Sequence, residues 1–151
     1  MVRRIFTLGT SNRTAEEFLA LLNRWGIRRI VDVRRFPTSK FEHFKKENLE
    51  SLLKAAGFEY KYFGDKLGGF RSGGYEAFAQ TEQFSQALSE LEEIASAAPT
   101  AVVCAERFPW RCHRRYIGFA LADRGWDVVH VIDEQRTWRP RQASPSLPEF
   151  P

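Results

Sequence analysis

Short apolar runs alternate along this chain with longer segments in which hydrophobic residues recur every three or four positions. Runs rich in Val and Ile are typical of strands that are buried on both faces of a sheet. A further run, 58–63, alternates apolar and polar residues, which predicts a half-exposed strand at a sheet edge. The buried strands are expected at 4–8, 30–34, 101–104 and 127–132.

The segments between these runs predict helices that each carry their apolar residues on one face. The first helix is expected to open at Thr14, because Thr14 and Glu17 have the spacing of a capping box, and to end at Gly26. The last is expected to follow Pro109, which suits a first helical position, and to run to about Arg124. The apolar faces of the other two lie at 49–56 and 84–95.

This alternation predicts a single α/β domain over residues 1–133, with a three-layer, mostly parallel, five-stranded Rossmann-like sheet and helices on both faces. Because the third strand reads as an edge, the expected strand order is 3-2-1-4-5. The remaining segment, 134–151, is rich in proline and is expected to form an extended or disordered C-terminal tail.

Composition limits the class of protein, its compartment and the charge of its partners, but it does not identify a function. No run of about 18 apolar residues predicts a transmembrane helix, and the N-terminus enters a strand without a signal-peptide core. Two cysteines are too few for a disulfide scaffold, which favours a reducing cytoplasm. The net charge of +4 indicates an anionic partner, either a small molecule or a nucleic acid.

The stretch AVVCAERFPWRCHRRY, residues 101–116, holds both cysteines and most of the candidate chemistry. Its helical part opens with basic residues and no acid, against the preference of a helix N-terminus for anions. An external anion would remove this conflict, because helix N–H groups and guanidinium groups would share it. We therefore expect an anion-binding site here, with Arg114 as a binding residue.

Cys104 is the first candidate nucleophile, since nearby guanidinium and N–H groups would lower its pKa and form a thiolate. The alternative is a small core residue, a common role of free cysteine. A phosphatase-like loop would need an arginine at the position of Trp110, whereas Arg111 comes one residue later. The phosphatase pattern therefore fails by one position.

Glu106, Cys112 and His113 are the other catalytic candidates. Glu106 could be a general base or a salt-bridge partner of a neighbouring arginine. His113 could be an acid, a base or an anion ligand, or a partly buried histidine bonded to a carbonyl. The spacing of Cys104, Cys112 and His113 matches no common zinc site, so no metal site is assigned, and no cofactor is identified.

Polar residues after the first two strands complete the predicted crevice. Ser11 and Asn12 lie in the loop after the first strand, and Asp32 and Arg34 end the second. The expected strand order places a topological switch point between strands one and four, where ligands bind in such sheets. We therefore expect these four residues to face Cys104 and to bind the substrate or its anion.

A glycine-rich loop at 64–74 follows the edge strand and has aromatic neighbours. Phe70 and Arg71, with the aromatic residues of the edge strand, could stack bases. The other interpretation is that these rings only cover an edge of the core.

A set of motifs is spread along the chain from Ile5 to Ile132: Thr7-Leu8-Gly9-Thr10-Ser11-Asn12-Arg13, Asp32-Val33-Arg34 with Pro37, Leu67-Gly68-Gly69, Cys104-Ala105-Glu106 with Pro109, Cys112-His113-Arg114, and His130. Together these motifs resemble domain-of-unknown-function family 488. The resemblance implies a site at these positions but supplies no reaction, and it departs at Thr10, where many relatives carry His or Tyr.

The sequence thus predicts an enzyme, a transferase or hydrolase, that acts on a phosphorylated, nucleotide or nucleic-acid substrate at the carboxyl edge of the sheet. Two other interpretations stay open. One is a non-catalytic module that binds nucleic acid through the same basic edge. The other is a redox or metal domain built on Cys104 and Cys112.

Overall fold

The computed structural model describes residues 3–36 and 39–139 of the chain. The strands are β1 (Arg4–Gly9), β2 (Arg29–Asp32), β3 (Glu59–Tyr62), β4 (Thr100–Cys104), β5 (Asp127–Val131) and β6 (Thr137–Trp138). The helices are α1 (Ala15–Arg24), α2 (Lys46–Ala55), α3 (Gly64–Leu67), α4 (Tyr75–Phe78), α5 (Glu82–Ala97) and α6 (Arg114–Asp123), with short 3₁₀ helices η1 (Glu42–Phe44) and η2 (Pro109–Arg111).

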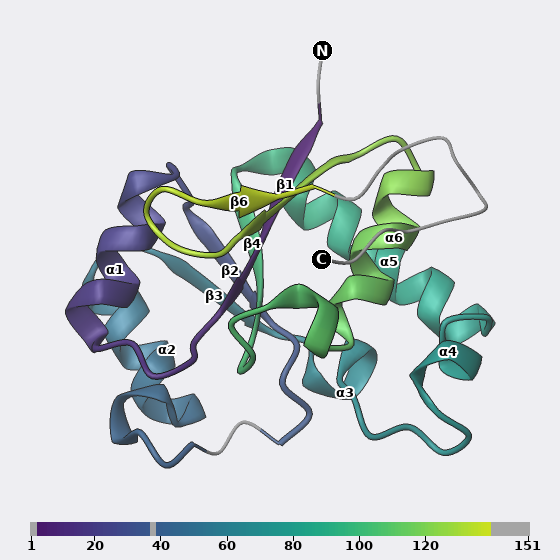
Figure 1. Cartoon of the computed structure of the whole chain (residues 1–151), viewed down its shortest axis with the longest axis horizontal. Coiled ribbons are helices and arrows are strands. Elements are labelled where there is room, and N and C mark those ends of the chain that lie inside the picture. Colours follow the sequence, from purple (N-terminus) through teal and green to yellow (C-terminus); the bar gives the residue numbers. More distant parts are fainter. Residues whose placement is uncertain (1–2, 37–38, 140–151) are drawn as a thin grey trace.

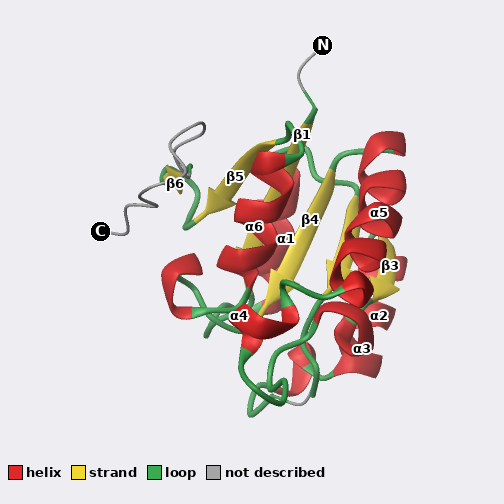
Figure 2. Cartoon of the chain, turned by 90° about the vertical axis from the view of Figure 1, so that its right-hand side faces the viewer, coloured by secondary structure: helices red, strands yellow, loops and turns green. Residues whose placement is uncertain are grey.

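The strands form one sheet whose two faces are both covered by helices, as in Figure 1. Helices α1 and α2 lie on one face, and Figure 2 shows α5 and α6 in front of the other. Phe18, Leu22 and Leu53 pack on the first face, and Leu91 and Leu121 pack on the second. The predicted three-layer α/β class is confirmed.

The strand order is β3-β2-β4-β1-β5-β6, so the expected order 3-2-1-4-5 is wrong at its centre. β1 and β4 are both apolar strands that are buried along almost their whole length, and the hydrophobic pattern does not distinguish the two central places. β3 lies at the edge, as expected, and pairs in parallel with β2. The exchange of β1 and β4 places the loop after β4 between the loops that follow β2 and β1.

Local signals set some of the helix ends. The capping box at the start of α1 is present, with Glu17 N donating to Thr14 Oγ1 at 3.0 Å and Thr14 N donating to Glu17 Oε1 at 2.7 Å. Gly125, after α6, has a φ of +95°, a conformation that favours glycine. The last helix differs from expectation, because the chain after Phe108 forms η2 first and α6 begins only at Arg114.

The first part of the predicted C-terminal tail belongs to the sheet. β6 pairs antiparallel with β5, with Thr137 opposite Val131 and Trp138 opposite His130. The rest of that prediction, residues 140–151, lies outside the described residues. Among the described helices, none has the length and apolar character needed to cross a membrane.

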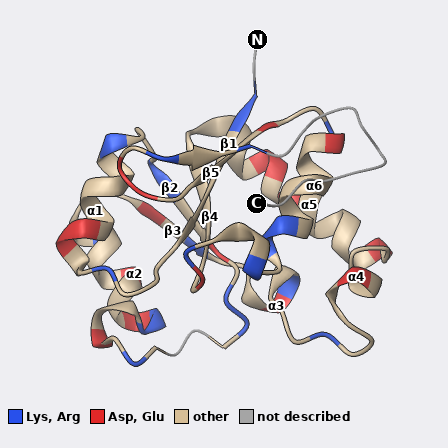
Figure 3. Ribbon diagram, viewed as in Figure 1, with Lys and Arg blue, Asp and Glu red and all other residues tan. Residues whose placement is uncertain are grey.

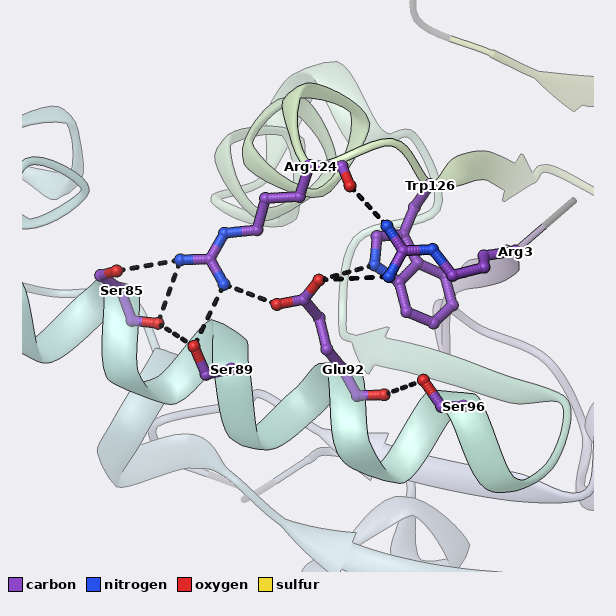
Figure 4. Close-up of polar contacts among 7 residues, drawn as sticks. All are labelled: Arg3, Ser85, Ser89, Glu92, Ser96, Arg124 and Trp126. Carbon is purple, nitrogen blue, oxygen red and sulfur yellow. Dashed lines mark hydrogen bonds and ion pairs between the residues drawn. The ribbon is translucent and has the colours of Figure 1, made fainter.

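A polar network fastens the C-terminal end of α6 to α5, as drawn in Figure 4. Arg124 donates to Glu92 Oε1 at 2.6 Å and to Ser85 Oγ at 2.9 Å. Glu92 Oε2 accepts from Trp126 Nε1 at 2.9 Å. Burial raises the pKa of Glu92, but the hydrogen bonds from Trp126 and Arg124 outweigh it and hold this pKa below its usual range. The network fixes α6 against its neighbour at the end remote from Cys104.

Candidate functional site

Cys104 ends β4 at the carboxyl edge of the sheet, and the chain then turns directly under the loop that follows β1. Thr10 N donates to Cys104 O and Ser11 N donates to Ala105 O, both at 2.8 Å. Gly9 allows this approach, because a Cβ at that position would lie 1.8 Å from the backbone oxygen of Glu106. The loop after β1 is therefore hydrogen-bonded to the Cys104 turn and holds it in place.

Arg114, the first residue of α6, is fully buried beside the Cys104 sulfur. Its Nη1 donates to Cys104 Sγ at 2.8 Å and also to Glu106 O, and its Nη2 donates to Arg107 O at 2.9 Å. Its Nε donates to Thr7 Oγ1 at 3.1 Å. Within the described residues, no carboxylate lies within ion-pair distance of this guanidinium group.

A second layer of buried polar groups holds Arg114. Thr7 Oγ1 lies 2.5 Å from His130 Nδ1, and burial lowers the pKa of His130 to about 3. His130 is therefore neutral at neutral pH, and its Nδ1 shares a hydrogen bond with the Thr7 hydroxyl group, whose oxygen also accepts from Arg114. Gly118 of α6 lies against the ring, where a Cβ would be 2.9 Å from its atoms. These contacts fix the guanidinium orientation through β1, β5 and α6.

The two cysteines form one thiol–thiolate pair. Cys112 Sγ donates to Cys104 Sγ at 2.7 Å. Burial alone would raise the pKa of Cys104, but the Cys112 hydrogen bond and the Arg114 charge lower it to about 6. The same hydrogen bond and burial raise the pKa of Cys112 well above its ordinary value. At neutral pH the geometry therefore favours a thiolate at Cys104 and a thiol at Cys112.

His113 lies beside this pair as a neutral ring. Its Nε2 is 3.1 Å from Val33 O, and because a carbonyl can only accept, Nε2 carries the ring proton. Its Nδ1 lies 3.6 Å from Cys112 Sγ. Burial lowers the pKa of His113 to about 4, despite the bond to Val33. His113 thus offers an unprotonated nitrogen next to the sulfur pair.

A pocket of about 400 Å³ opens above Cys104, which is itself only 1% exposed. It is lined by Arg34, Arg35, Phe36, Gly69, Phe70, Tyr75, Cys104, Ala105, Glu106, Arg111, Cys112 and His113. A larger hollow of about 610 Å³ lies at the opposite end of the strands, against Arg3, Trp25 and Trp126, and has no thiol, histidine or carboxylate in its lining. Unlike this hollow, the pocket over Cys104 combines a cavity with two thiols, a histidine and a carboxylate.

A family model described as "Domain of unknown function DUF488" matches residues 14–121 of this chain. The chain belongs to this family. The match spans the pocket from Arg34 to His113 and ends within α6, whereas Thr7 and His130 lie outside it. The chain matches none of the curated proteins and none of the solved structures compared with it.

The DUF488 domain brings five of the nine sequence-predicted site residues to the pocket wall: Arg34, Cys104, Glu106, Cys112 and His113. Arg114 is buried behind the lining residues and donates a hydrogen bond to Cys104 Sγ. Ser11 and Asn12 lie on the β1 side of the Cys104 turn and are not among the lining residues, and Asn12 Oδ1 accepts from Arg107 at 3.2 Å. The pocket lies between the loops after β2 and β4, because β4, and not β1, is the neighbour of β2.

Asp32 and Arg34 form a buried pair with each other. Arg34 Nε and Nη2 donate to the two carboxylate oxygens of Asp32, each at 2.9 Å, and Arg34 Nη1 donates to Phe44 O at 2.6 Å. Tyr60 donates to Asp32 Oδ2 at 2.6 Å. This bidentate arrangement joins β2 to β3 and η1, so it shapes the pocket wall of the DUF488 domain.

Sequence reasoning missed several residues of the DUF488 pocket. Arg35, Phe36 and Tyr75 were not singled out, and no spacing rule connects them with Cys104. Thr7 and His130, which are not among the lining residues, belong to the motifs quoted for the family resemblance, and each is also a polar residue inside a largely apolar strand. Within the described part of the chain, no group of three or more His, Cys, Asp or Glu side chains is arranged to hold a metal ion.

Proposed function

We propose that this protein is an enzyme, a transferase or hydrolase, that attacks a phosphorylated or nucleotide substrate with the Cys104 thiolate. One observation carries the proposal: a fully buried guanidinium, Arg114, donates to a sulfur at the floor of an open pocket and has no carboxylate partner among the described residues. Burying an unpaired charge is costly, so the thiolate is the natural counter-charge. An ionised sulfur that lines a pocket is a competent nucleophile.

An anionic substrate fits the charges on the pocket wall. Arg35 and Arg111 line the pocket, and within the described residues neither has a carboxylate in ion-pair distance. In Figure 3, basic residues mark the first turn of α6 and the loops around it. Guanidinium groups bind phosphate oxygens in a bidentate manner, so these two side chains are the proposed anion-binding groups.

The proposed step is a nucleophilic displacement. The Cys104 sulfur forms a bond to the electrophilic atom of the substrate, while the bond to the leaving oxygen breaks and that oxygen takes a proton from water. Water, or the hydroxyl group of a second substrate, then displaces the sulfur and restores the thiolate, and Glu106 takes the proton of this second nucleophile as a general base. Cys112 donates to the sulfur in the resting state, and Arg114 and Thr7 position it.

Two measurements test the proposal. Turnover of phosphate monoesters and mononucleotides should be lost in Cys104→Ser and lowered in Glu106→Gln, while Cys112→Ser keeps part of it. A neutral and an anionic alkylating agent, iodoacetamide and iodoacetate, should also differ at Cys104. Arg35→Gln and Arg111→Gln should each lower the iodoacetate rate relative to the iodoacetamide rate by about fivefold.

If the two reagents react alike with all these variants, the pocket does not select anions. If Cys104 stays unmodified until the protein unfolds, the nucleophile is wrong.

A second candidate function, a thiol redox centre, is supported by the 2.7 Å distance between the two sulfur atoms. A peroxide would oxidise the Cys104 thiolate to a sulfenic acid and be reduced to water, and the Cys112 thiol would then condense with it to a disulfide and release water. Intact-mass measurement after peroxide treatment should then show loss of two hydrogen atoms in the wild-type chain. Cys112→Ser should instead stop at the sulfenic acid or oxidise further.

A further inference from the structure

Two large apolar side chains stand exposed at the mouth of the pocket. Phe36 is 63% exposed and Phe70 is 84% exposed, and their ring centroids are 5.7 Å apart at 45°. They come from different loops, one after β2 and one after α3, and both line the pocket that holds Cys104. Single exposed apolar residues are ordinary, but a pair of rings that meet over a reactive sulfur indicates a ligand-binding feature.

The loop that carries Phe70 is held in a specific shape. Phe70 has a φ of +58°, which non-glycine residues adopt rarely. Gly68 permits the loop to approach the segment that follows β2, because a Cβ there would lie 2.6 Å from Arg35 Cβ. Arg71 donates to Gly68 O and Asp65 O, both at 2.8 Å. The ring of Phe70 is therefore presented by a fixed turn.

Cationic groups lie beside the rings. The Arg35 guanidinium carbon is 6.0 Å from the Phe36 ring centroid, and Arg111 lines the same pocket. A ligand that satisfies both features has a flat aromatic part and an anionic part. The volume of about 400 Å³ lies at the small end of the range for small-molecule sites, which suits one nucleotide unit.

We propose that Phe36 and Phe70 stack on the base of a nucleotide whose phosphate is bound by Arg35 and Arg111. This inference rests on the proposed function, because it names the substrate class of the same site. Stacking on exposed phenylalanine rings accepts every base, since each base has a π-face. The nucleotide is either a free mononucleotide or one unit of a single strand.

The test is a calorimetric titration of the full chain with AMP, GMP, CMP and UMP, with ribose 5-phosphate, and with a short single-stranded oligonucleotide. At least one nucleotide should bind about 5- to 150-fold more tightly than ribose 5-phosphate, which has the phosphate but no base. Phe36→Leu and Phe70→Leu should remove this difference, since leucine is apolar but has no ring. Phe70→Tyr is the matched control and should keep it.

The oligonucleotide distinguishes the two sources. If it binds in a manner lost in Phe70→Leu while mononucleotides bind no better than ribose 5-phosphate, the nucleotide belongs to a strand. If neither ligand exceeds ribose 5-phosphate, or if both leucine variants bind as the wild-type chain does, the inference is overturned. In that event the reactivity of Cys104 toward simple phosphate esters still decides the proposed function separately. Stacked nucleotide binding beside an inert Cys104 would reject the proposed function alone.

Both phenylalanine side chains are largely exposed, so the leucine variants should fold. Unchanged thermal unfolding confirms this before the titration. Affinity for ribose 5-phosphate should also stay unchanged in these variants, which separates a stacking role from damage to the phosphate site.

Discussion

Arg34 and Arg114 are two buried arginines near the same edge of the sheet, but they differ in their counter-charge. Arg34 is 5% exposed and shares a bidentate pair with Asp32. Arg114 is fully buried, and its acceptors are two backbone carbonyls, a hydroxyl and the Cys104 sulfur. One guanidinium is neutralised by a carboxylate and the other by a thiol that must first ionise.

The difference shows how one kind of residue can serve as scaffold and as part of a reactive site. A carboxylate in water is ionised throughout the neutral range, so the Asp32–Arg34 pair is a fixed element that holds β2 against Tyr60 and Phe44. A thiol has an ordinary pKa of about 8.5, so its charge near neutral pH depends on its surroundings. For Cys104 the Cys112 hydrogen bond and the buried charge of Arg114 supply those surroundings, and they outweigh the burial that raises its pKa.

The largest expected effect follows from removing the fixed pair. Arg34→Met leaves Asp32 buried without its cation, and we expect the free energy of unfolding to fall by about 3–5 kcal/mol. Urea unfolding measures the loss. The double variant Asp32→Asn, Arg34→Met should recover part of it, and a loss below about 1 kcal/mol would show that the pair is not a structural element.

The second prediction concerns the pair of Cys104 and Arg114 and the pH dependence of the free energy of unfolding. The pKa of Cys104 is lowered to about 6 in the folded chain, because the Cys112 hydrogen bond and Arg114 outweigh burial, which raises it. The contribution of the Cys104 thiolate to the free energy of unfolding is therefore fully present above about pH 8.5 and is lost as the pH falls through about 6. Between about pH 8.5 and about pH 6, the free energy of unfolding measured with urea should fall by on the order of 3 kcal/mol more in the wild-type chain than in Cys104→Ser.

The two buried histidines affect the free energy of unfolding at lower pH than Cys104 does, so their effect can be distinguished from that of the thiol. His113 and His130 have pKa values lowered by burial to about 4 and about 3, so they stay neutral in the folded chain while the unfolded chain takes up protons below about pH 6.5. Their contribution is also lost as the pH falls, but it remains in Cys104→Ser. Parallel profiles of the two proteins above pH 6.5 would mean that Cys104 is protonated in the folded state.

The third prediction removes the cation and keeps the thiol. In Arg114→Met, Cys104 can take up its proton at pH 7 at little cost, so the loss of stability should be about 2 kcal/mol, mainly from the lost hydrogen bonds. The decisive readout is the midpoint of the pH dependence of Cys104 alkylation, which should rise from about 6 because only the Cys112 hydrogen bond and the Glu106 backbone contact remain to lower the pKa. Arg115→Met, at the neighbouring position of α6, is the control and should leave this midpoint in place. A midpoint unmoved in Arg114→Met would assign the lowered pKa to Cys112 alone.

The sequence supports part of this comparison and leaves the rest open for physical reasons. Apolar periodicity predicts the strands and helices, and the placement of Cys104, Glu106, Cys112 and His113 after one strand predicts their grouping. The order of β1 and β4 is not predictable from burial, since both strands are mostly apolar and are buried along almost their whole length. The sequence also gives the positions of the arginines, but it does not show which groups accept their hydrogen bonds.

For that reason the expectation that Arg34 and Arg114 bind an external anion stays a prediction. In the structure both guanidinium groups donate hydrogen bonds to acceptors within the protein. Arg35 and Phe36, which face the pocket, follow Arg34 directly in the chain. Which of two adjacent arginines points inward depends on the strand register against β4, and that register comes from tertiary packing.

The smallest expected effect is at the other end of α6, where Arg124 is paired with Glu92 as in Figure 4. Both side chains are partly exposed, at 28% and 21%, so solvent screens the pair. Glu92→Gln should lower the free energy of unfolding by no more than about 1 kcal/mol, because the amide oxygen still accepts from Trp126. The alkylation midpoint of Cys104 should stay where it is, since the site depends on Arg114 and not on the charge at the far end of the helix. If that midpoint moves in Glu92→Gln, the position of α6 as a whole sets the thiol pKa, and the contrast between the two buried arginines no longer explains the site.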